Sequence, residues 1–317
     1  MTLLSFVIPC YRSEKTIARV IAEIDSVVRQ RSDFDYEIIA VDDCSPDNVL
    51  GVLRQLAREN SRLRVISLAR NTGKHAAVLA GYRHLQGEIV VNLDDDLQSP
   101  TTELWRLLEP ILSGQADFST ARYTIAKQVW WKRVGSYVNN LMGDLLLDKP
   151  ADLRFYNFNA GRRFVCDEVA KYRHPYPYIE GLVLRVTHRI ASVEMKDRPR
   201  GDELPTGFTL RKSMSLLLNG LTAFSVTPLR IATIAGMIFS GIGFAGLVYT
   251  IINKLLMPQV PAGFTSLMSV LLFTNGFTML SLGLLGEYLG RVYICINDAP
   301  QSVVRETINV PRPDSSR

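Results

Sequence analysis

The chain has 317 residues, a formal net charge of +5 and a pI of about 9.0, with a mean hydropathy of +0.09. This length suits one large domain or two modest ones, and the basic residues concentrate at 185–212 and beside the apolar stretches. That pattern favours an anionic membrane surface or a phosphate-bearing substrate over nucleic acid, and four isolated cysteines argue against a zinc site.

Residues 4–121 alternate short apolar runs with amphipathic segments. Strands are predicted at 4–9, 36–41, 64–69, 88–93 and 117–121. Helices are predicted at 14–31, from the N-cap Ser45 to 60, at 74–85 and from Pro100 to 113. This alternation predicts an α/β fold with a mostly parallel, doubly wound sheet, and the absence of GxGxxG and P-loop motifs argues against dehydrogenases and NTPases.

The middle of the chain is less regular. Residues 129–147 have helical spacing, which fits either a core helix or a helix on a membrane surface. The sequence assigns no element to 152–161, but it predicts a short helix at 178–186 and a strand at 189–195. The amphipathic pattern of 208–224 predicts a helix that lies in the membrane interface.

Two long uncharged stretches follow, at about 231–253 and 264–286. At 1.5 Å per residue each is long enough to cross a hydrocarbon core of roughly 30 Å. The alternative is a pair of buried core helices. The flanking Arg211, Lys212, Arg230 and Arg291 place both ends of the hairpin in the cytosol by the positive-inside rule.

The sequence therefore predicts four regions. These are a cytosolic α/β domain (1–207), a juxtamembrane amphipathic helix (208–228), two transmembrane helices (229–290) and a cytosolic C-terminal tail (291–317).

Three successive carboxylates, Asp94, Asp95 and Asp96, end the predicted strand 88–93. Ligands of open α/β sheets bind at the carboxyl ends of strands, so we expect a site here. Three adjacent anions need compensation, and their hard oxygens suit Mg²⁺ or Mn²⁺. An extended chain would point Asp94, Asp96 and Gln98 to one side and Asp95 away, so we expect Asp95 to matter least. The alternative is a solvated acidic turn.

Other strand ends carry complementary groups. Asp42 and Asp43 end the second predicted strand, and Arg70, Lys74 and His75 follow the third. A nucleotide-sugar needs acceptors for its base and ribose, a cation on its diphosphate and basic groups for the remaining charge. The three strand ends together supply all of these.

The ordered motifs resemble those of family 2 glycosyltransferases with the GT-A fold. They are Val7-Ile8-Pro9-Cys10-Tyr11, Val41-Asp42-Asp43-Cys44-Ser45, Arg70-Asn71-Thr72-Gly73-Lys74 and Leu93-Asp94-Asp95-Asp96-Leu97-Gln98-Ser99-Pro100. Two further stretches, Phe224–Arg230 and Gly283–Arg291, are similar to the membrane motifs of the polyisoprenyl-phosphate glycosyltransferases. The resemblance spans roughly residues 4–305.

The resemblance implies site residues in four groups. Nucleotide-sugar binding would fall to Pro9, Tyr11, Asp42, Asp43, Lys74 and Asp94. The cation, Mg²⁺ or Mn²⁺, would be held by Asp94, Asp96 and Gln98. The lipid phosphate would contact Lys132, Arg133 and Arg200. Catalytic roles would fall to Asp152, Arg198 and Arg122, with Asp152 where relatives carry a proposed base.

The resemblance implies an inverting transfer of one sugar from a nucleotide-sugar to undecaprenyl (polyisoprenyl) phosphate, for cell-surface polysaccharide or lipopolysaccharide modification. The expected setting is the cytosolic face of a bacterial inner membrane, with a multi-pass, homo-oligomeric protein and no nucleic-acid partner. Gly236, Ser240 and Gly243 would permit close helix packing. The alternatives are a diacylglycerol-type or glycan acceptor, or a non-catalytic nucleotide-binding membrane scaffold.

Overall fold

The protein divides into two compact units, Met1–Gly207 with Ala299–Arg317 and Phe208–Asp298. Its structure, a computed structural model, describes residues 1–123, 155–174, 177–195, 227–256, 263–296 and 300–311. The predicted helices at 129–147 and 208–224 lie outside these ranges, as does most of the predicted juxtamembrane region 208–228.

Strands and helices alternate along the first unit, and two helices form the described part of the second. The strands are β1 (Thr2–Cys10), β2 (Phe34–Asp42), β3 (Leu63–Leu68), β4 (Ile89–Asn92), β5 (Phe118–Tyr123), β6 (Asn159–Arg162), β7 (Ile190–Met195) and β8 (Val304–Ile308). The helices are α1 (Ile17–Val28), α2 (Val49–Glu59), α3 (Lys74–Tyr82), the 3₁₀ turn η1 (Thr101–Glu103), α4 (Leu104–Leu112), α6 (Arg163–Ala170), α7 (Ile179–Val186), α9 (Thr227–Leu256) and α10 (Phe264–Ile296).

The sheet has eight strands in the order β7-β5-β6-β4-β1-β2-β3-β8. Its centre, β4-β1-β2-β3, is parallel, as the alternation of strands and helices predicts. β6 runs antiparallel to β4 and β5, and β8 runs antiparallel to β3. The predicted α/β class with a mostly parallel sheet is therefore confirmed.

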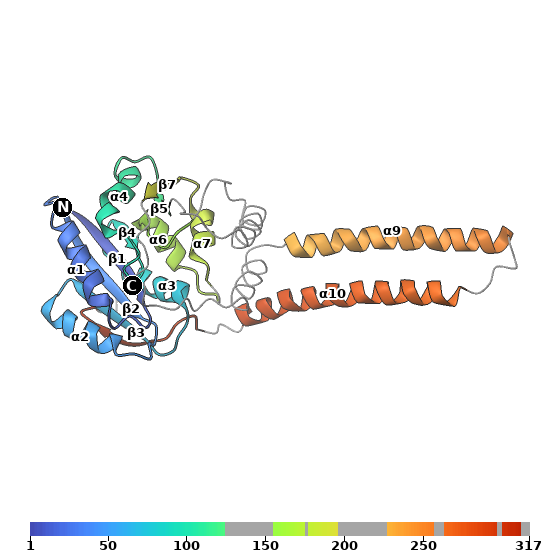
Figure 1. Ribbon diagram of the computed structural model, residues 1–317, viewed down its shortest axis with the longest axis horizontal. Coiled ribbons are helices and arrows are strands. Elements are labelled where there is room, and N and C mark those ends of the chain that lie inside the picture. The colour runs from blue at the N-terminus through green and yellow to red at the C-terminus, as the bar shows by residue number, and fades with distance from the viewer. Residues whose placement is uncertain (124–154, 175–176, 196–226, 257–262, 297–299, 312–317) are drawn as a thin grey trace. The chain divides into compact units, whose positions relative to one another are not determined.

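Helices cover both faces of the sheet (Figure 1). Alternate residues of β1 face opposite sides, so Phe6 and Ile8 pack with α1, α2 and α4, whereas Val7 packs with α3, α6 and α7. None of the three is more than 1% exposed. Because both faces are buried, the central strands are largely apolar, and the polar Ser5 and Glu37 inside β1 and β2 are hydrogen-bonded to each other.

Helix α2 begins later than the sequence predicts. Ser45 was expected as its N-cap, but the helix starts at Val49 with Asn48 in the cap position. The Ser45 hydroxyl instead accepts a hydrogen bond from the Arg12 backbone N–H (2.8 Å) and donates one to Asp47 Oδ1 (2.5 Å). The predicted cap is wrong, because Ser45 ties the loop after β2 to the loop after β1.

Residues 159–170 form two elements that the sequence does not predict, β6 and α6. β6 is short and carries polar residues, so it lacks the apolar run of the parallel strands. It fits between β4 and β5 because Gly161 leaves room for a neighbour. A Cβ atom at this position would lie 2.7 Å from Phe118 Cδ2.

The C-terminal segment is part of the sheet domain. The sequence predicts a separate tail from residue 291, but α10 continues to Ile296 and β8 then pairs with β3. The Arg54 guanidinium on α2 forms a bidentate ion pair with Glu306 of β8, with distances of 3.2 and 2.5 Å. Asn309, directly after β8, donates hydrogen bonds to the carbonyls of Ala57 and Leu63 and so attaches the end of the strand to the domain.

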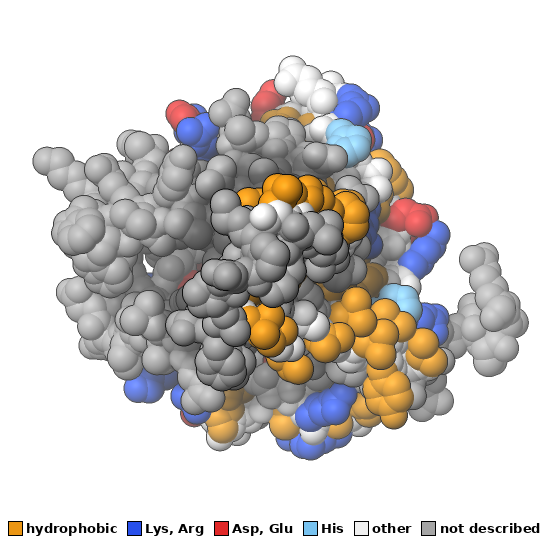
Figure 2. All heavy atoms as spheres, turned by 90° about the vertical axis from the view of Figure 1, so that its right-hand side faces the viewer, with side chains coloured by type: hydrophobic (Ala, Val, Ile, Leu, Met, Phe, Trp, Pro, Cys, Tyr) orange, Lys and Arg blue, Asp and Glu red, His pale blue; other side chains and the backbone are white. Residues whose placement is uncertain are grey.

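The second unit contains α9 and α10, which include the predicted spans 231–253 and 264–286. A Cβ atom at Gly236 would lie 3.7 Å from Phe277 Cε1, so the two helices are in contact there. Large apolar side chains are exposed on both helices, and in Figure 2 the described side chains near the centre of the view are hydrophobic. Within the described residues, no helix combines the length and the apolarity that a membrane crossing requires.

Candidate active site

Strand register brings the predicted acidic residues to one edge of the sheet. Cys10, the last residue of β1, pairs with Asp42, and Val7 pairs with Asn92 at the end of β4. Tyr11 follows β1 directly, and Asp94 comes two residues after the end of β4. The carboxyl ends of β1, β2 and β4 therefore form a common polar edge, as ligand sites of open α/β sheets require.

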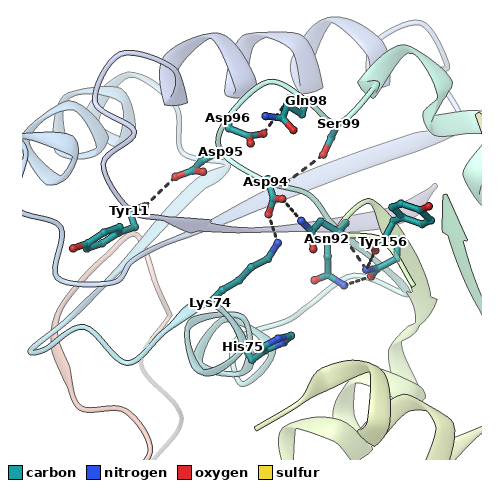
Figure 3. A network of polar contacts seen from close by, with 12 residues as sticks. Tyr11, Lys74, His75, Asn92, Asp94, Asp95, Asp96, Gln98, Ser99 and Tyr156 are labelled. Carbon is teal, nitrogen blue, oxygen red and sulfur yellow. Dashed lines mark hydrogen bonds and ion pairs between the residues drawn. The ribbon is translucent and has the colours of Figure 1, made fainter. Parts of the chain in front are cut away.

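The acidic segment Asp94–Asp96 is a turn and not an extended chain. Leu97 directly after it has a φ of 64°, which a leucine rarely adopts. The three carboxylates point in three directions, toward Lys74, toward Tyr11 and toward Gln98 (Figure 3). The expectation that Asp94, Asp96 and Gln98 share one side is therefore wrong.

Both oxygens of Asp94 have hydrogen-bonding partners. Lys74 Nζ donates to Oδ1, and the side-chain amide of Asn157 donates to Oδ2 at 2.5 Å. The Asp94 side chain is 20% exposed and that of Lys74 38%, so the pair is open to a ligand. Lys74 thus supplies part of the charge compensation that the sequence analysis assigned to a cation alone.

Asp95 is the most constrained of the three carboxylates. Its Oδ2 accepts a hydrogen bond from the Tyr11 backbone N–H at 2.9 Å. Burial raises the pKa of Asp95 from 3.8 to about 6, with a smaller contribution from the charges of Asp94 and Asp96. Asp95 was expected to matter least, but it joins the acidic turn to the loop after β1.

Asp96 and Gln98 offer the remaining cation ligands. The Gln98 backbone N–H donates to Asp96 Oδ1 at 3.1 Å, and the Gln98 side-chain nitrogen is buried without a hydrogen-bond partner among the described residues. Because an amide can exchange its oxygen and nitrogen by rotation, Gln98 can offer an oxygen in that place. The donor set of Asp94, Asp96 and Gln98 therefore fits Mg²⁺ or Mn²⁺ in its chemistry. This set has two carboxylates and one amide, and among the described residues no group of three or more His, Cys, Asp or Glu side chains is placed to hold a metal ion.

Asp42 and Asp43 are each 3% exposed and hold the backbone of this edge. Asp42 accepts hydrogen bonds from the Ser45 N–H (3.0 Å) and from the Ser67 hydroxyl (2.8 Å). Asp43 accepts from the loop between β3 and α3. Its donors are the Thr72 N–H at 2.7 Å, the Thr72 hydroxyl at 3.0 Å and the Gly73 N–H at 2.8 Å.

The loop after β1 presents an aromatic ring at the edge of the site. Pro9 is buried, whereas Tyr11 is 43% exposed. The guanidinium carbon of Arg12 lies 5.6 Å from the centroid of the Tyr11 ring. Arg12 and Cys44 have φ values of 59° and 50°, so unfavourable backbone conformations gather at this edge together with Leu97. Such strain is common where a binding site needs a fixed geometry.

His75 lies apart from the acidic turn. In Figure 3 its ring points away from Asp94, and its Nδ1 lies 3.7 Å from Glu180 Oε2 on α7. The ring also packs edge-to-face on Tyr178, with centroids 5.6 Å apart. These contacts join α3 to α7.

The predicted phosphate-binding and catalytic residues fall into two groups. Arg122 is described and lies exposed near the carboxyl end of β5, opposite Glu194 of β7 in the strand register. Because β5 is parallel to β4, Arg122 lies at the same edge of the sheet as Asp94. The others lie outside the described residues, namely Asp152, Arg198, Lys132, Arg133 and Arg200.

Three asparagines, none of which the sequence motifs indicate, support the acidic turn. The Asn92 amide donates to Tyr82 OH (2.7 Å) and to Asn159 Oδ1 (2.6 Å). Asn159 in turn donates to the carbonyl of Asn157, which binds Asp94. An Asn at the end of the buried strand β4 was a visible signal, because a buried amide needs hydrogen-bonding partners.

Solved structures share this architecture. The crystal structure of glucosyl-3-phosphoglycerate synthase from Mycobacterium tuberculosis with Mn²⁺ and UDP-glucose is 21% identical. It has a TM-score of 0.53, with 70% of this chain and 77% of that chain covered. The complex of the same enzyme with UDP is 22% identical at a TM-score of 0.51, covering 69% and 79%. At this identity the similarity establishes the fold.

Curated relatives match nearly the whole chain. The undecaprenyl-phosphate 4-deoxy-4-formamido-L-arabinose transferase of Edwardsiella ictaluri is 31% identical, covering 99% of this chain and 96% of that protein. The uncharacterized glycosyltransferase YkcC of Bacillus subtilis is 30% identical, covering 96% and 94%. The family model of the GtrB C-terminal hairpin matches residues 227–292, and that of glycosyl transferase family 2 matches residues 5–170. The family expected from the motifs is thereby confirmed, and the chain belongs to glycosyl transferase family 2.

Proposed function

We propose that this glycosyltransferase moves one sugar, with inversion, from a nucleotide-sugar to undecaprenyl or another polyisoprenyl phosphate. The observation that carries the proposal is the match to the undecaprenyl-phosphate transferase of Edwardsiella ictaluri. The matched region covers 99% of this chain, so it includes both the sheet domain and the hairpin. The product would serve cell-surface polysaccharide or lipopolysaccharide modification.

The site chemistry supports a donor with a diphosphate. Tyr11 offers an exposed ring for the base, and Lys74 offers a cation beside Asp94. Pro9 and Asp42 are proposed to shape the nucleoside pocket, and Asp43 to act by holding the Thr72-Gly73 backbone. Asp94, Asp96 and Gln98 would hold Mg²⁺ or Mn²⁺, which when bound stabilises the negative charge of the departing nucleoside diphosphate.

A phosphate acceptor changes what the protein must supply. A lipid phosphate is already an anion near neutral pH, so it can attack the anomeric carbon without a strong general base. The harder task is to bring two anions together. We assign this to Arg122 and Arg198 and to the lipid-phosphate group Lys132, Arg133 and Arg200. Asp152 is then secondary, and Asp152→Asn should retain measurable transfer, whereas a complete loss would favour a general-base role.

We further propose that α9 and α10 anchor the enzyme in a bacterial inner membrane, with the sheet domain and both termini in the cytosol. Exposed apolar side chains on both helices, such as Met237, Phe244 and Met279, support this. A cysteine introduced at position 260 should react with an impermeant maleimide in intact spheroplasts, and one at position 315 should react only after lysis. Labelling of both before lysis would contradict this topology.

We also propose that the protein forms a homo-oligomer.

An acceptor comparison tests the proposal. Purified enzyme is given radiolabelled nucleotide-sugars with undecaprenyl phosphate, diacylglycerol or a glycan, and with Mg²⁺. Label should enter only the polyisoprenyl phosphate. Label in diacylglycerol or in the glycan would establish an alternative acceptor, and nucleotide binding without any transfer would point to a scaffold.

A further inference from the structure

The segment that follows α10 contacts the loop between β3 and α3 directly. The Ala69 N–H donates to the Val303 carbonyl at 2.8 Å, and Arg305 Nη2 donates to the Ala69 carbonyl at 3.1 Å. Arg70 Nη2 donates to the Pro300 carbonyl at 2.8 Å. The N-terminal end of the loop is therefore fixed by residues that lie more than two hundred positions later in the sequence.

The C-terminal end of the same loop is fixed by Asp43, whose carboxylate accepts the hydrogen bonds of Thr72 and Gly73. Gly73 has φ 86° and ψ 158°, a conformation essentially restricted to glycine. Lys74 follows at once as the first residue of α3 and pairs with Asp94. The position of Lys74 thus depends on a loop that is held at both ends.

β8 has anchors that do not involve this loop. Glu306 pairs with Arg54 on α2, and Asn309 binds the carbonyls of Ala57 and Leu63. The contacts that dock the strand on the domain are thus distinct from those that hold residues 69–70. This separation allows the two roles to be tested one at a time.

We propose that the segment Pro300–Arg305 is a positioning element of the donor site. It holds residues 69–73 against Asp43, so that Lys74 is placed to bind the diphosphate of a nucleoside diphosphate. This inference rests on the proposed function.

The test compares two neighbouring residues of β8 in the full-length protein. Arg305→Ala removes a contact to the loop, whereas Glu306→Ala removes only the ion pair with Arg54. The Kd of UDP, GDP and dTDP with Mn²⁺ is measured by calorimetry, together with the Tm. Loss of one hydrogen bond corresponds to an increase in Kd of about two- to tenfold. We expect this increase for Arg305→Ala alone, with similar Tm values for the two variants.

Hydrogen exchange of the backbone amides at 70–74 supplies a readout that needs no nucleotide. It should accelerate in Arg305→Ala and remain as in wild type in Glu306→Ala, and Arg305→Lys should restore slow exchange. Equal exchange in both alanine variants, or an increase in Kd that only parallels the loss of Tm, would overturn the positioning role. If wild type binds no nucleoside diphosphate, the proposed function fails, and the exchange measurement alone decides the role of the segment.

Discussion

The Asn157 side-chain amide donates a hydrogen bond to Asp94 Oδ2 at 2.5 Å, across two strands that run in opposite directions. Asn157 precedes the antiparallel strand β6, which pairs with β4 and thereby brings the amide beside the acidic turn. Lys74 holds the other oxygen of the same carboxylate. Asp94 is therefore oriented by one neutral donor and one charged donor.

Asn157→Ala should reduce transfer by about tenfold or more, because a hydrogen bond to a charged group contributes about 1.5–3 kcal/mol. Initial rates at saturating donor and acceptor give the effect. Asn60→Ala is the matched control. It also removes an Asn side-chain hydrogen bond, the one that Asn60 Oδ1 accepts from the Arg62 N–H in the loop before β3. Equal activity of the two variants would show that Asn157 does not serve the site.

Gly73→Ala should destabilise the protein by about 1–3 kcal/mol, because its backbone conformation suits only glycine. A Cβ atom at Gly73 meets no atom within 4 Å, so the cost is purely conformational. Gly114, with φ 75° and equally open space, is the matched control in the loop after α4. Both alanine variants should lose Tm, but only Gly73→Ala should weaken UDP binding. Equal binding by the two would contradict the role of the 69–73 loop.

Asp95→Asn should stabilise the protein at pH 8 in the absence of divalent cations. The pKa of Asp95 is raised from 3.8 to about 6 in the folded state, so the folded protein binds this proton more tightly than the unfolded chain. Wild-type stability then falls as the pH rises from about 4 to about 6, by at most about 3 kcal/mol. Denaturant unfolding in detergent with EDTA should show the difference at pH 8 and its loss at pH 4. A difference that is the same at both pH values would contradict the assignment.

The parallel centre of the sheet was predictable because its strands are buried on both faces. Continuous apolar runs with amphipathic helices between them identify β1 to β4, and strand ends then place Tyr11, Asp42 and Asp94 at one edge. These features are local in the sequence. The antiparallel additions β6 and β8 were not predicted, since their short polar segments form strands only by pairing with β4 and β3.

Side-chain directions within the acidic turn could not be predicted from alternation. The chain forms a turn at Asp95–Asp96 instead of an extended strand, and Asp95 points toward Tyr11. The sequence gives no sign of the role of Asn157, because its partner Asp94 follows another strand, β4, and lies 63 positions earlier in the chain. Ser45 was misassigned as a helix cap because it binds two other partners, Arg12 in the loop after β1 and Asp47 in its own loop.

The most direct measurement of the central claim is the formation of a lipid-linked sugar by wild type and by Asp96→Ala. Both proteins are reconstituted with undecaprenyl phosphate and Mg²⁺ and given a panel of radiolabelled nucleotide-sugars. Wild type should transfer label to the lipid from one donor, and Asp96→Ala should retain its fold but form no product. Normal turnover by Asp96→Ala would contradict the site, and absence of lipid-linked product from every donor with wild type would contradict the proposed reaction.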